Sequence, residues 1–377
     1  MTRRSSTHLV ATLLAASLLS TGLLSTGPAL AETKVPADLT QMPPPSNSYK
    51  PKKTSWGDPD FRGNWPINDI AELPVERPEK FGNRQWMTDE EVAQASARAQ
   101  QLQTAYKQEE QQDTIGRGHW IEYLSESRRT GMLVDPANGQ LPELTDEGKW
   151  RASHMRSSWV AGQTYDWLDD FDSWDRCITR GFPASMLPFR YNNGIRIFQT
   201  PGYVVINLEM LGTRIVPLGD KAAAWPSGVD AWMGNSRGRW EDGNTLVIET
   251  DHIREGASPL NMATRGVPPN NVLPTSDQAK VVERLHMVGP NTITYEMTYA
   301  DPVVWQAPFT LRVDWTRDET YETFEYACHE GNVQPRNYIS SNRALRAQQT
   351  AEAQAKLAPP PVAATTPAPA AAPKRRR

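Results

Sequence analysis

Between residues 191 and 328 the chain repeatedly alternates apolar and polar residues in short runs separated by turn residues. A period of two places the apolar residues of each run on one face of a β-strand. Asp242-Gly243-Asn244 and Gly289-Pro290-Asn291 are typical of tight hairpin connections. Sequential strands with short connections predict a mainly β fold: an antiparallel meander curled or closed into a barrel, lipocalin-like in outline, with peripheral helices. The predicted strands span 195–199, 203–210, 214–218, 245–250, 281–288, 292–299, 310–315 and 322–328.

Helices are predicted outside this sheet. Thr88 and Glu91 form a capping-box pattern ahead of apolar residues at heptad-like spacing. A second helix is predicted over 145–156 and a polar one over 342–357. Residues 251–277 are expected to form a long loop of the kind that often serves as a lid.

The expected organisation is a signal peptide (1–31), a proline-rich leader (32–55), a β-rich domain (56–340), and a polar helix with an Ala/Pro-rich tail ending in KRRR (341–377).

The N-terminus has the composition of a cleavable export signal. Arg3 and Arg4 precede an apolar run over 9–24, and Ala29-Leu30-Ala31 supplies a small-x-small cleavage pattern after Ala31. The run is shorter than a comfortable membrane span, so no integral span is expected. A periplasmic or secreted location follows, and the arginine pair leaves both the general and the twin-arginine export routes open.

Charge restricts the partners that this chain is expected to bind. The net charge is -4, and leaving out Arg3, Arg4 and the four terminal basic residues leaves −10 for residues 32–373. An acidic body of this kind repels nucleic acid, so no nucleic-acid partner is expected. The basic end of the tail has two interpretations: contact with an anionic envelope surface, or a solvated tail without a partner.

The chain has two cysteines, Cys177 and Cys328. Two thiols in an oxidising compartment commonly pair, which predicts a disulfide worth about 4 kcal/mol through the long loop that it closes. Two free buried thiols are the alternative, because a sequence gives no distance between them.

Strong cofactor and catalytic motifs are absent from the sequence. It has no phosphate-binding loop, no dinucleotide-binding glycine pattern, no nucleophile elbow and no HExxH zinc motif. The five histidines of the exported part are scattered without the spacing of metal ligands. No cofactor and no metal are therefore expected, and export argues against diffusible cytosolic cofactors such as ATP.

One candidate site lies where the strand region begins. Tyr191, Asn192, Asn193 and Arg196 supply hydrogen-bonding groups in place of apolar alternation, and Glu209 lies on the polar face of the next strand. That face points either to solvent, as an outward polar stripe, or into a barrel lumen. In a lumen Glu209 would lie near Arg196, a costly pair unless it serves a ligand.

A second candidate group surrounds Cys328. Alternation places Glu325 and His329 on one face, where a carboxylate can orient an imidazole for proton transfer. A plain hydrogen-bonded histidine at the end of a strand is the alternative interpretation.

Two further segments carry residues suited to ligands. Interleaved aromatic and acidic residues over 165–175 are the material of sugar subsites, although Trp167, Phe171 and Trp174 also fit the packed face of an amphipathic helix. Arg237, in the glycine-flanked segment 234–240, suits an anionic group such as a carboxylate, with a solvated loop arginine as the alternative.

Several segments together resemble an uncharacterised family of secreted bacterial proteins. They are RCITRG at 176–181, MLPFRYNNGIRIFQTPGYVVINLEM at 186–210, GNSRGRWEDGNTLVIET at 234–250, Val282-Glu283-Arg284, and YACHEGN at 326–332. The resemblance covers most of residues 130–335 and implies export and a common fold. It implies no established activity and no catalytic residues.

Two functions are expected to compete. One is an exported lyase or hydrolase acting on an acidic glycan or an aromatic small molecule in a β-barrel cavity. Its proton-transfer residues would be Tyr191 and His329, with Glu209 as base or orienting group, and Asn192, Asn193, Arg196, Arg237 and Glu325 would bind the substrate. The other is a non-catalytic extracytoplasmic protein that binds a small ligand or oligosaccharide in the same cavity.

Overall fold

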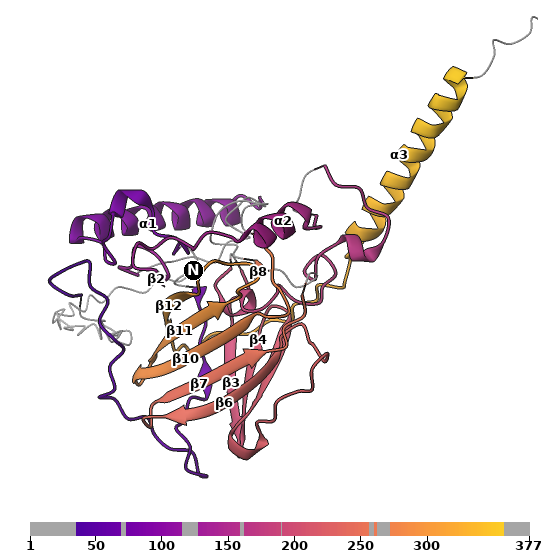
Figure 1. Cartoon of the computed structure of the whole chain (residues 1–377). Helices are drawn as coiled ribbons and strands as arrows, with labels where there is room; N and C mark the ends of the chain where they lie inside the picture. Colours follow the sequence, from indigo (N-terminus) through magenta and orange to yellow (C-terminus); the bar gives the residue numbers. More distant parts are fainter. Residues whose placement is uncertain are drawn as a thin grey trace, which may run out of the picture.

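The computed structural model describes residues 35–68, 73–114, 127–158, 162–189, 191–255, 260–261 and 272–357. The predicted signal peptide, Arg190, much of the 251–277 loop and the tail with its basic end lie outside these residues. The described part is built mainly from two antiparallel sheets, with three α-helices at their margins (Figure 1).

The smaller sheet has four strands and the larger sheet has six. In spatial order the smaller sheet contains β1 (Gly63–Asn64), β3 (Ile195–Thr200), β4 (Tyr203–Leu208) and β5 (Gly212–Pro217). The larger contains β2 (Leu133–Asp135), β12 (Phe309–Thr316), β11 (Thr292–Ala300), β10 (Lys280–Gly289), β7 (Thr245–Asp251) and β6 (Asn235–Glu241). A separate short pair joins β8 (Leu260–Asn261) to β9 (Val272–Leu273).

The expected antiparallel meander is confirmed, but a closed or lipocalin-like barrel is not. Neither sheet closes on itself among the described residues. The two sheets approach at one edge, where Leu218, just after β5, forms a parallel bridge with Gly238 of β6. Gly238 permits this approach, because a Cβ there would lie 2.6 Å from Leu218 Cδ2 and 2.9 Å from Val216 Cγ1. The two hairpin turns predicted from the sequence do join β6 to β7 and β10 to β11.

One hydrophobic core lies between the sheets. Strand alternation supplies it: in β4 Val204, Ile206 and Leu208 are buried, while the residues between them face outward. The same pattern in β10, β11 and β12 contributes the largest core side chains, among them Tyr295, Tyr299 and Trp315. Side chains therefore fill the space that a ligand-binding barrel would leave open.

The helices are α1 (Asp89–Gln111), α2 (Asp146–His154) and α3 (Gln334–Leu357). The predicted capping box is present, since Thr88 Oγ1 accepts from the Glu91 amide and Glu91 accepts from the Thr88 amide. Helices α1 and α2 lie along one end of the sheets, and α3 projects away from the body (Figure 1). No helix in the described ranges is long and apolar enough to cross a membrane.

Three local predictions are wrong. Residues 322–328 form no strand, whereas the segment 234–240, interpreted as a glycine-flanked loop, lies almost entirely in β6. The helix considered for 165–175 is replaced by turns around a short 3₁₀ segment at Leu168–Asp170, and Trp167 is exposed. These turns bring residues 172–177 to the site described below.

The proline-rich leader lies against the body where it is described. Lys50 Nζ donates to the Asp242 carbonyl at 2.8 Å, and Arg312 Nη1 donates to the Pro43 carbonyl at 2.5 Å. Tyr49 packs partly buried on the core. This segment therefore covers part of the larger sheet, although its composition predicts an exposed leader.

Candidate functional site

A disulfide links Cys177 to Cys328, as the sequence predicts. The bond joins residues 151 positions apart and brings their Cα atoms to 5.6 Å. Cys177 lies in a turn after the aromatic and acidic segment, and Cys328 lies in the irregular chain between β12 and α3. The bond therefore holds two loops side by side at one end of the sheets.

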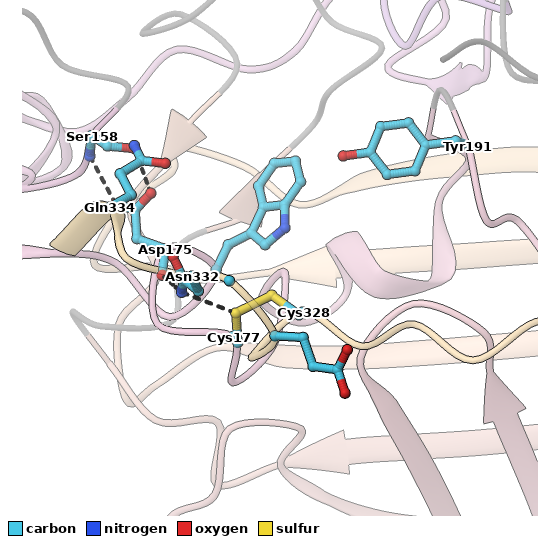
Figure 2. A pocket seen from close by; sticks show the side chains of 10 residues that line it. Ser158, Asp175, Cys177, Tyr191, Cys328, Asn332 and Gln334 are labelled. Atoms are coloured by element: carbon cyan, nitrogen blue, oxygen red, sulfur yellow. Dashed lines mark hydrogen bonds between the residues drawn. A yellow bond between two sulfur atoms is a disulfide. The ribbon is translucent and has the colours of Figure 1, made fainter. Parts of the chain in front are cut away.

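A cavity of about 460 Å³ lies beside this disulfide. We call it the disulfide pocket. None of its lining residues belongs to a strand: turns and loops supply nine of the ten, and Gln334 is the first residue of α3. In Figure 2 the Tyr191 hydroxyl points across the pocket toward the side where Ser158, Asp175, Asn332 and Gln334 gather. The lining consists of Ser158, Trp174, Asp175, Cys177, Tyr191, Cys328, Glu330, Gly331, Asn332 and Gln334.

Aromatic rings form one wall of the pocket. The ring of Phe189 packs edge-on against Trp174, with centroids 4.8 Å apart, and against Tyr191 at 5.0 Å. The Arg180 guanidinium lies 4.5 Å from the Phe189 ring and 5.9 Å from the Trp174 ring. Cation–π contacts of this kind fix the rings in place, so the aromatic wall is a packed surface.

Arg180 is itself buried behind this wall. Burial lowers the pKa of Arg180 to about 10, although the nearby Tyr191 and Tyr326 oppose that shift. Nη1 donates to the Leu187 carbonyl at 3.2 Å, whereas Nε and Nη2 have no hydrogen-bond partner within the described part of the chain. The guanidinium is thus a positive charge behind the rings, outside the lining itself.

The opposite wall is polar and acidic. Asp175 Oδ2 accepts from the Ser158 amide at 2.8 Å, and its Oδ1 accepts from Ser158 Oγ. Asn332 Nδ2 donates to the Asp175 carbonyl at 2.9 Å and to Cys177 Sγ at 3.1 Å. These contacts join Asn332, which follows Cys328, to the turn that precedes Cys177. They also orient an amide and a carboxylate at the pocket.

A second carboxyl group lies directly behind Asp175. Asp172 Oδ1 accepts from the amides of Trp174 and Asp175 at 2.9 and 2.8 Å, and Oδ2 accepts from Ser157 Oγ at 2.8 Å. Burial and the charge of Asp175 raise the pKa of Asp172 to about 6, against the hydrogen bonds that lower it. Asp172 therefore shapes the turn and adds to the acidity of this wall.

Tyr191 and the two cysteines are the sequence-predicted residues that the pocket brings together. Asn193 is buried next to them and clamps the backbone of Phe189, accepting from its amide at 2.7 Å and donating to its carbonyl at 2.8 Å. Asn192 Nδ2 donates to Glu209 at 3.1 Å. The two asparagines therefore support the pocket wall from outside the lining.

Glu209 is buried and already holds four donors. They are Asn192 Nδ2, the Gly194 amide at 2.9 Å, the Tyr321 hydroxyl at 2.5 Å and the Phe324 amide at 3.0 Å. A carboxylate with this many donors is an anchor. It fastens the irregular chain after β12 to the start of β3.

The remaining predicted residues lie apart from the disulfide pocket. Arg196 is exposed on β3, with its guanidinium 5.1 Å from the Phe198 ring. Arg237 makes a two-pronged ion pair with Asp251 at 3.0 and 2.7 Å. Glu325 and His329 are exposed, and neither belongs to the lining. Arg196 and Glu209 thus do not form the pair expected for a barrel lumen.

The sequence does not predict the other seven lining residues as site candidates: Ser158, Trp174, Asp175, Glu330, Gly331, Asn332 and Gln334. Trp174 and Asp175 lie within the aromatic and acidic segment that is suited to sugars, so composition already pointed to them. Asn332 lies in the YACHEGN segment. For Ser158 and Gln334 the sequence offers no signal, because only the fold brings them to this place.

The pocket combines flat aromatic surfaces with carboxylate, amide and hydroxyl groups. Within the ranges that the structure describes, no group of three or more His, Cys, Asp or Glu side chains is arranged to hold a metal ion. Comparison of the chain with protein-family models, with curated proteins and with solved structures finds no match.

Proposed function

We propose that this protein binds an oligosaccharide, neutral or carrying amino sugars, in the disulfide pocket. The observation that carries the proposal is the pairing, in one cavity, of the Trp174 and Tyr191 rings with the polar side chains of Asp175, Asn332 and Gln334. Aromatic faces stack on the apolar faces of sugar rings, while carboxylates and amides accept and donate hydrogen bonds to hydroxyls.

The charge of the lining supports a neutral or basic glycan over an acidic one. Asp175 and Glu330 line the pocket, and no lysine or arginine belongs to its lining among the residues that the structure describes. A uronic acid carboxylate would face these two like charges, whereas an ammonium group would be attracted by them. Arg180 is buried behind the aromatic rings, and its Nε and Nη2 atoms are shielded from solvent.

Glycan binding is tested on a neutral, basic and acidic oligosaccharide array, followed by calorimetric titration of the oxidised protein with each oligosaccharide that binds. We expect Trp174→Ala to weaken binding about tenfold or more, since a lost aromatic stack costs roughly 0.5–1.5 kcal/mol in addition to the buried area that is lost with it. Trp150→Ala is the matched control, because Trp150 is an exposed tryptophan on α2 outside the pocket. Tyr191→Ala tests the same wall if Trp174→Ala does not fold. Unchanged binding by both ring variants, or absence of binding to every glycan, would refute the proposal.

A hydrolase that cleaves the bound glycan is the second candidate. Asp175 and Glu330 place two carboxyl groups in one pocket, and glycoside hydrolysis employs a pair of carboxyl groups. Burial raises the pKa of Asp172, behind this wall, to about 6. His329 lies outside the lining, so lyase chemistry through Tyr191 and His329 receives less support. In an enzyme, Asp175→Asn and Glu330→Gln abolish the release of reducing ends while binding survives. A binding protein releases none, even at protein concentrations equal to those of the glycan.

We also propose that the protein is exported and belongs to the secreted family that its sequence resembles. The disulfide supports an oxidising compartment, since such bonds are rare in the cytosol. Export predicts a mature N-terminus at Glu32 in protein purified from a bacterial periplasm, read by mass spectrometry. A full-length chain recovered only from the cytosol would contradict it.

A further inference from the structure

A second cavity, of about 590 Å³, lies at the end of the larger sheet where β10 begins and β11 passes into β12. We call it the β11–β12 pocket. It shares no lining residue with the disulfide pocket. The lining consists of Asp277, Gln278, Lys280, Ala300, Asp301, Pro302, Trp305, Gln306, Ala307 and Pro308.

Asp301 holds the two loops of this pocket in a fixed arrangement. Its carboxylate accepts from the Ser276 amide at 2.8 Å, from Ser276 Oγ at 2.7 Å, and from the amides of Val303 and Val304 at 3.2 and 3.3 Å. The Tyr299 hydroxyl adds a fifth bond at 3.2 Å. Asp301 is buried, so these bonds are shielded from water and the loop geometry is built in advance of any ligand.

The body of the pocket is apolar. Trp305 in the lining is buried, and its ring packs edge-on against Phe309 at 5.3 Å, while Pro302 and Pro308 are exposed. The Trp305 indole N–H has no hydrogen-bond partner within the described residues. A buried donor without a partner is costly, so a ligand acceptor that reached it would be favoured.

Two opposite charges are placed at the same pocket. Asp277 and Lys280 both line it, both are exposed, and neither forms an ion pair in the part of the chain that the structure describes. A ligand with one charge is attracted by one of these groups and repelled by the other. A ligand that carries an ammonium and a carboxylate is complementary to both.

We propose that the β11–β12 pocket binds a small zwitterion of the α-amino-acid type with an apolar side chain. Lys280 receives the carboxylate, Asp277 receives the ammonium group, and the side chain lies against Trp305 and the two prolines. The volume falls in the range of pockets that bury small molecules. This site is independent of the disulfide pocket, so it stands whether or not that pocket binds glycans.

The test uses L-phenylalanine as the probe and the indole resonances of protein labelled with ¹⁵N-tryptophan as the signal. The Trp305 resonance is assigned by its loss in Trp305→Phe. We expect L-phenylalanine to shift it saturably, and Lys280→Met and Asp277→Asn each to weaken binding about tenfold, the effect of losing one charge-assisted contact. Both variants change exposed side chains and are expected to fold. Lys356→Met and Glu352→Gln on α3 are charge-matched controls that should leave the affinity unchanged.

Two analogues separate the roles of the charges. Phenethylamine lacks the carboxylate and 3-phenylpropionate lacks the ammonium group, so each should bind the wild type about tenfold more weakly than phenylalanine does. Lys280→Met should cause no further loss for phenethylamine, and Asp277→Asn none for 3-phenylpropionate. An unmoved Trp305 resonance, equal affinities for the three compounds, or affinities unaffected by both variants would overturn the proposal.

Discussion

The surroundings of the disulfide pocket change the pKa of Asp172, the carboxyl group behind its acidic wall. Its carboxyl group is buried, close to Asp175, and held by two backbone amides and a serine hydroxyl. Burial and the neighbouring carboxylate both favour the protonated form. Folding therefore raises the pKa of this carboxyl group from 3.8 to about 6.

This shift predicts how the stability of the protein depends on pH through Asp172. Because the folded pKa lies above the unfolded one, the contribution of Asp172 is fully present below about pH 4 and is lost as the pH rises through 6. Asp172→Asn should thus raise the free energy of unfolding at pH 7.5, by on the order of 1 kcal/mol, and raise it less at pH 4.5. Urea unfolding at the two pH values measures this, with Asp230→Asn at an exposed position as the control. A variant destabilised equally at both values would show that the carboxylate is needed as an acceptor.

The residues of the site were partly predictable from sequence. The bond between Cys177 and Cys328 is predictable, because two cysteines in an oxidising compartment commonly pair. The sequence does not predict that Tyr191 lies beside this bond. Nor does it predict the ion pair of Arg237, since its partner Asp251 is set by the pairing of β6 with β7. Ser158 reaches the pocket from a turn and Gln334 from the start of α3, and the positions of both depend on long-range contacts that no local pattern encodes.

At the scale of elements, one buried ion pair joins the two sheets. Arg214 of β5 donates to both oxygens of Glu283 of β10, at 2.9 and 2.6 Å, and both side chains are almost completely buried. Arg214 Nη2 also donates to Ser236 Oγ at 3.0 Å, and the Tyr295 hydroxyl donates to Glu283 at 2.9 Å. Burial beside the Glu283 carboxylate raises the pKa of Tyr295 well above its ordinary value. The pair fixes which strands of the two sheets face each other.

Removal of one partner should therefore cost more than removal of both. Arg214→Met or Glu283→Met alone leaves a buried charge without compensation, and we expect a loss of about 3–5 kcal/mol in the free energy of unfolding. The double variant should regain much of that loss, because two apolar side chains then fill the same space. Guanidinium unfolding of the four proteins gives the coupling energy as a double-mutant cycle. Additive losses would show that the two charges do not depend on each other.

The strands of this core were largely predictable, and the ion pair shows where such prediction stops. Seven of the eight predicted segments form strands, because alternation records which face is buried. Arg214 alternates in phase with the buried Val216, and Glu283 with Val281 and Leu285, so the sequence already carries the signal of two inward charges. That these charges meet depends on how the two sheets pack, which no single strand encodes. The sequence likewise does not predict that the sheets remain open, because closure into a barrel depends on the register between their edge strands.

At the scale of the whole molecule, the chain after β12 is held to the body by separate attachments. Glu209 anchors Tyr321 and Phe324, the disulfide fixes Cys328, and Tyr338 of α3 packs on Tyr165 with ring centroids 5.0 Å apart. No strand pairing holds residues 317–333, as the structure describes them. The disulfide is the covalent attachment among these, and it forms part of the pocket wall itself.

Loss of the disulfide should consequently affect global stability and the pocket together. Replacing Cys177 and Cys328 by serine releases a loop of about 150 residues and should lower the free energy of unfolding by about 4 kcal/mol. Hydrogen exchange should rise most in residues 325–340 and in the turn at 172–177, because Asn332 and Asp175 then lose their fixed spacing. Denaturant unfolding and exchange mass spectrometry measure the two effects.

Reductant should reproduce both effects in the wild type and change nothing in the double serine variant. This control separates loss of the bond from loss of the cysteine side chains. The alternative outcome is that exchange rises equally in the two sheets and in the pocket segments. In that case the disulfide stabilises the protein only by restricting the unfolded chain, and hydrogen bonds maintain the pocket wall.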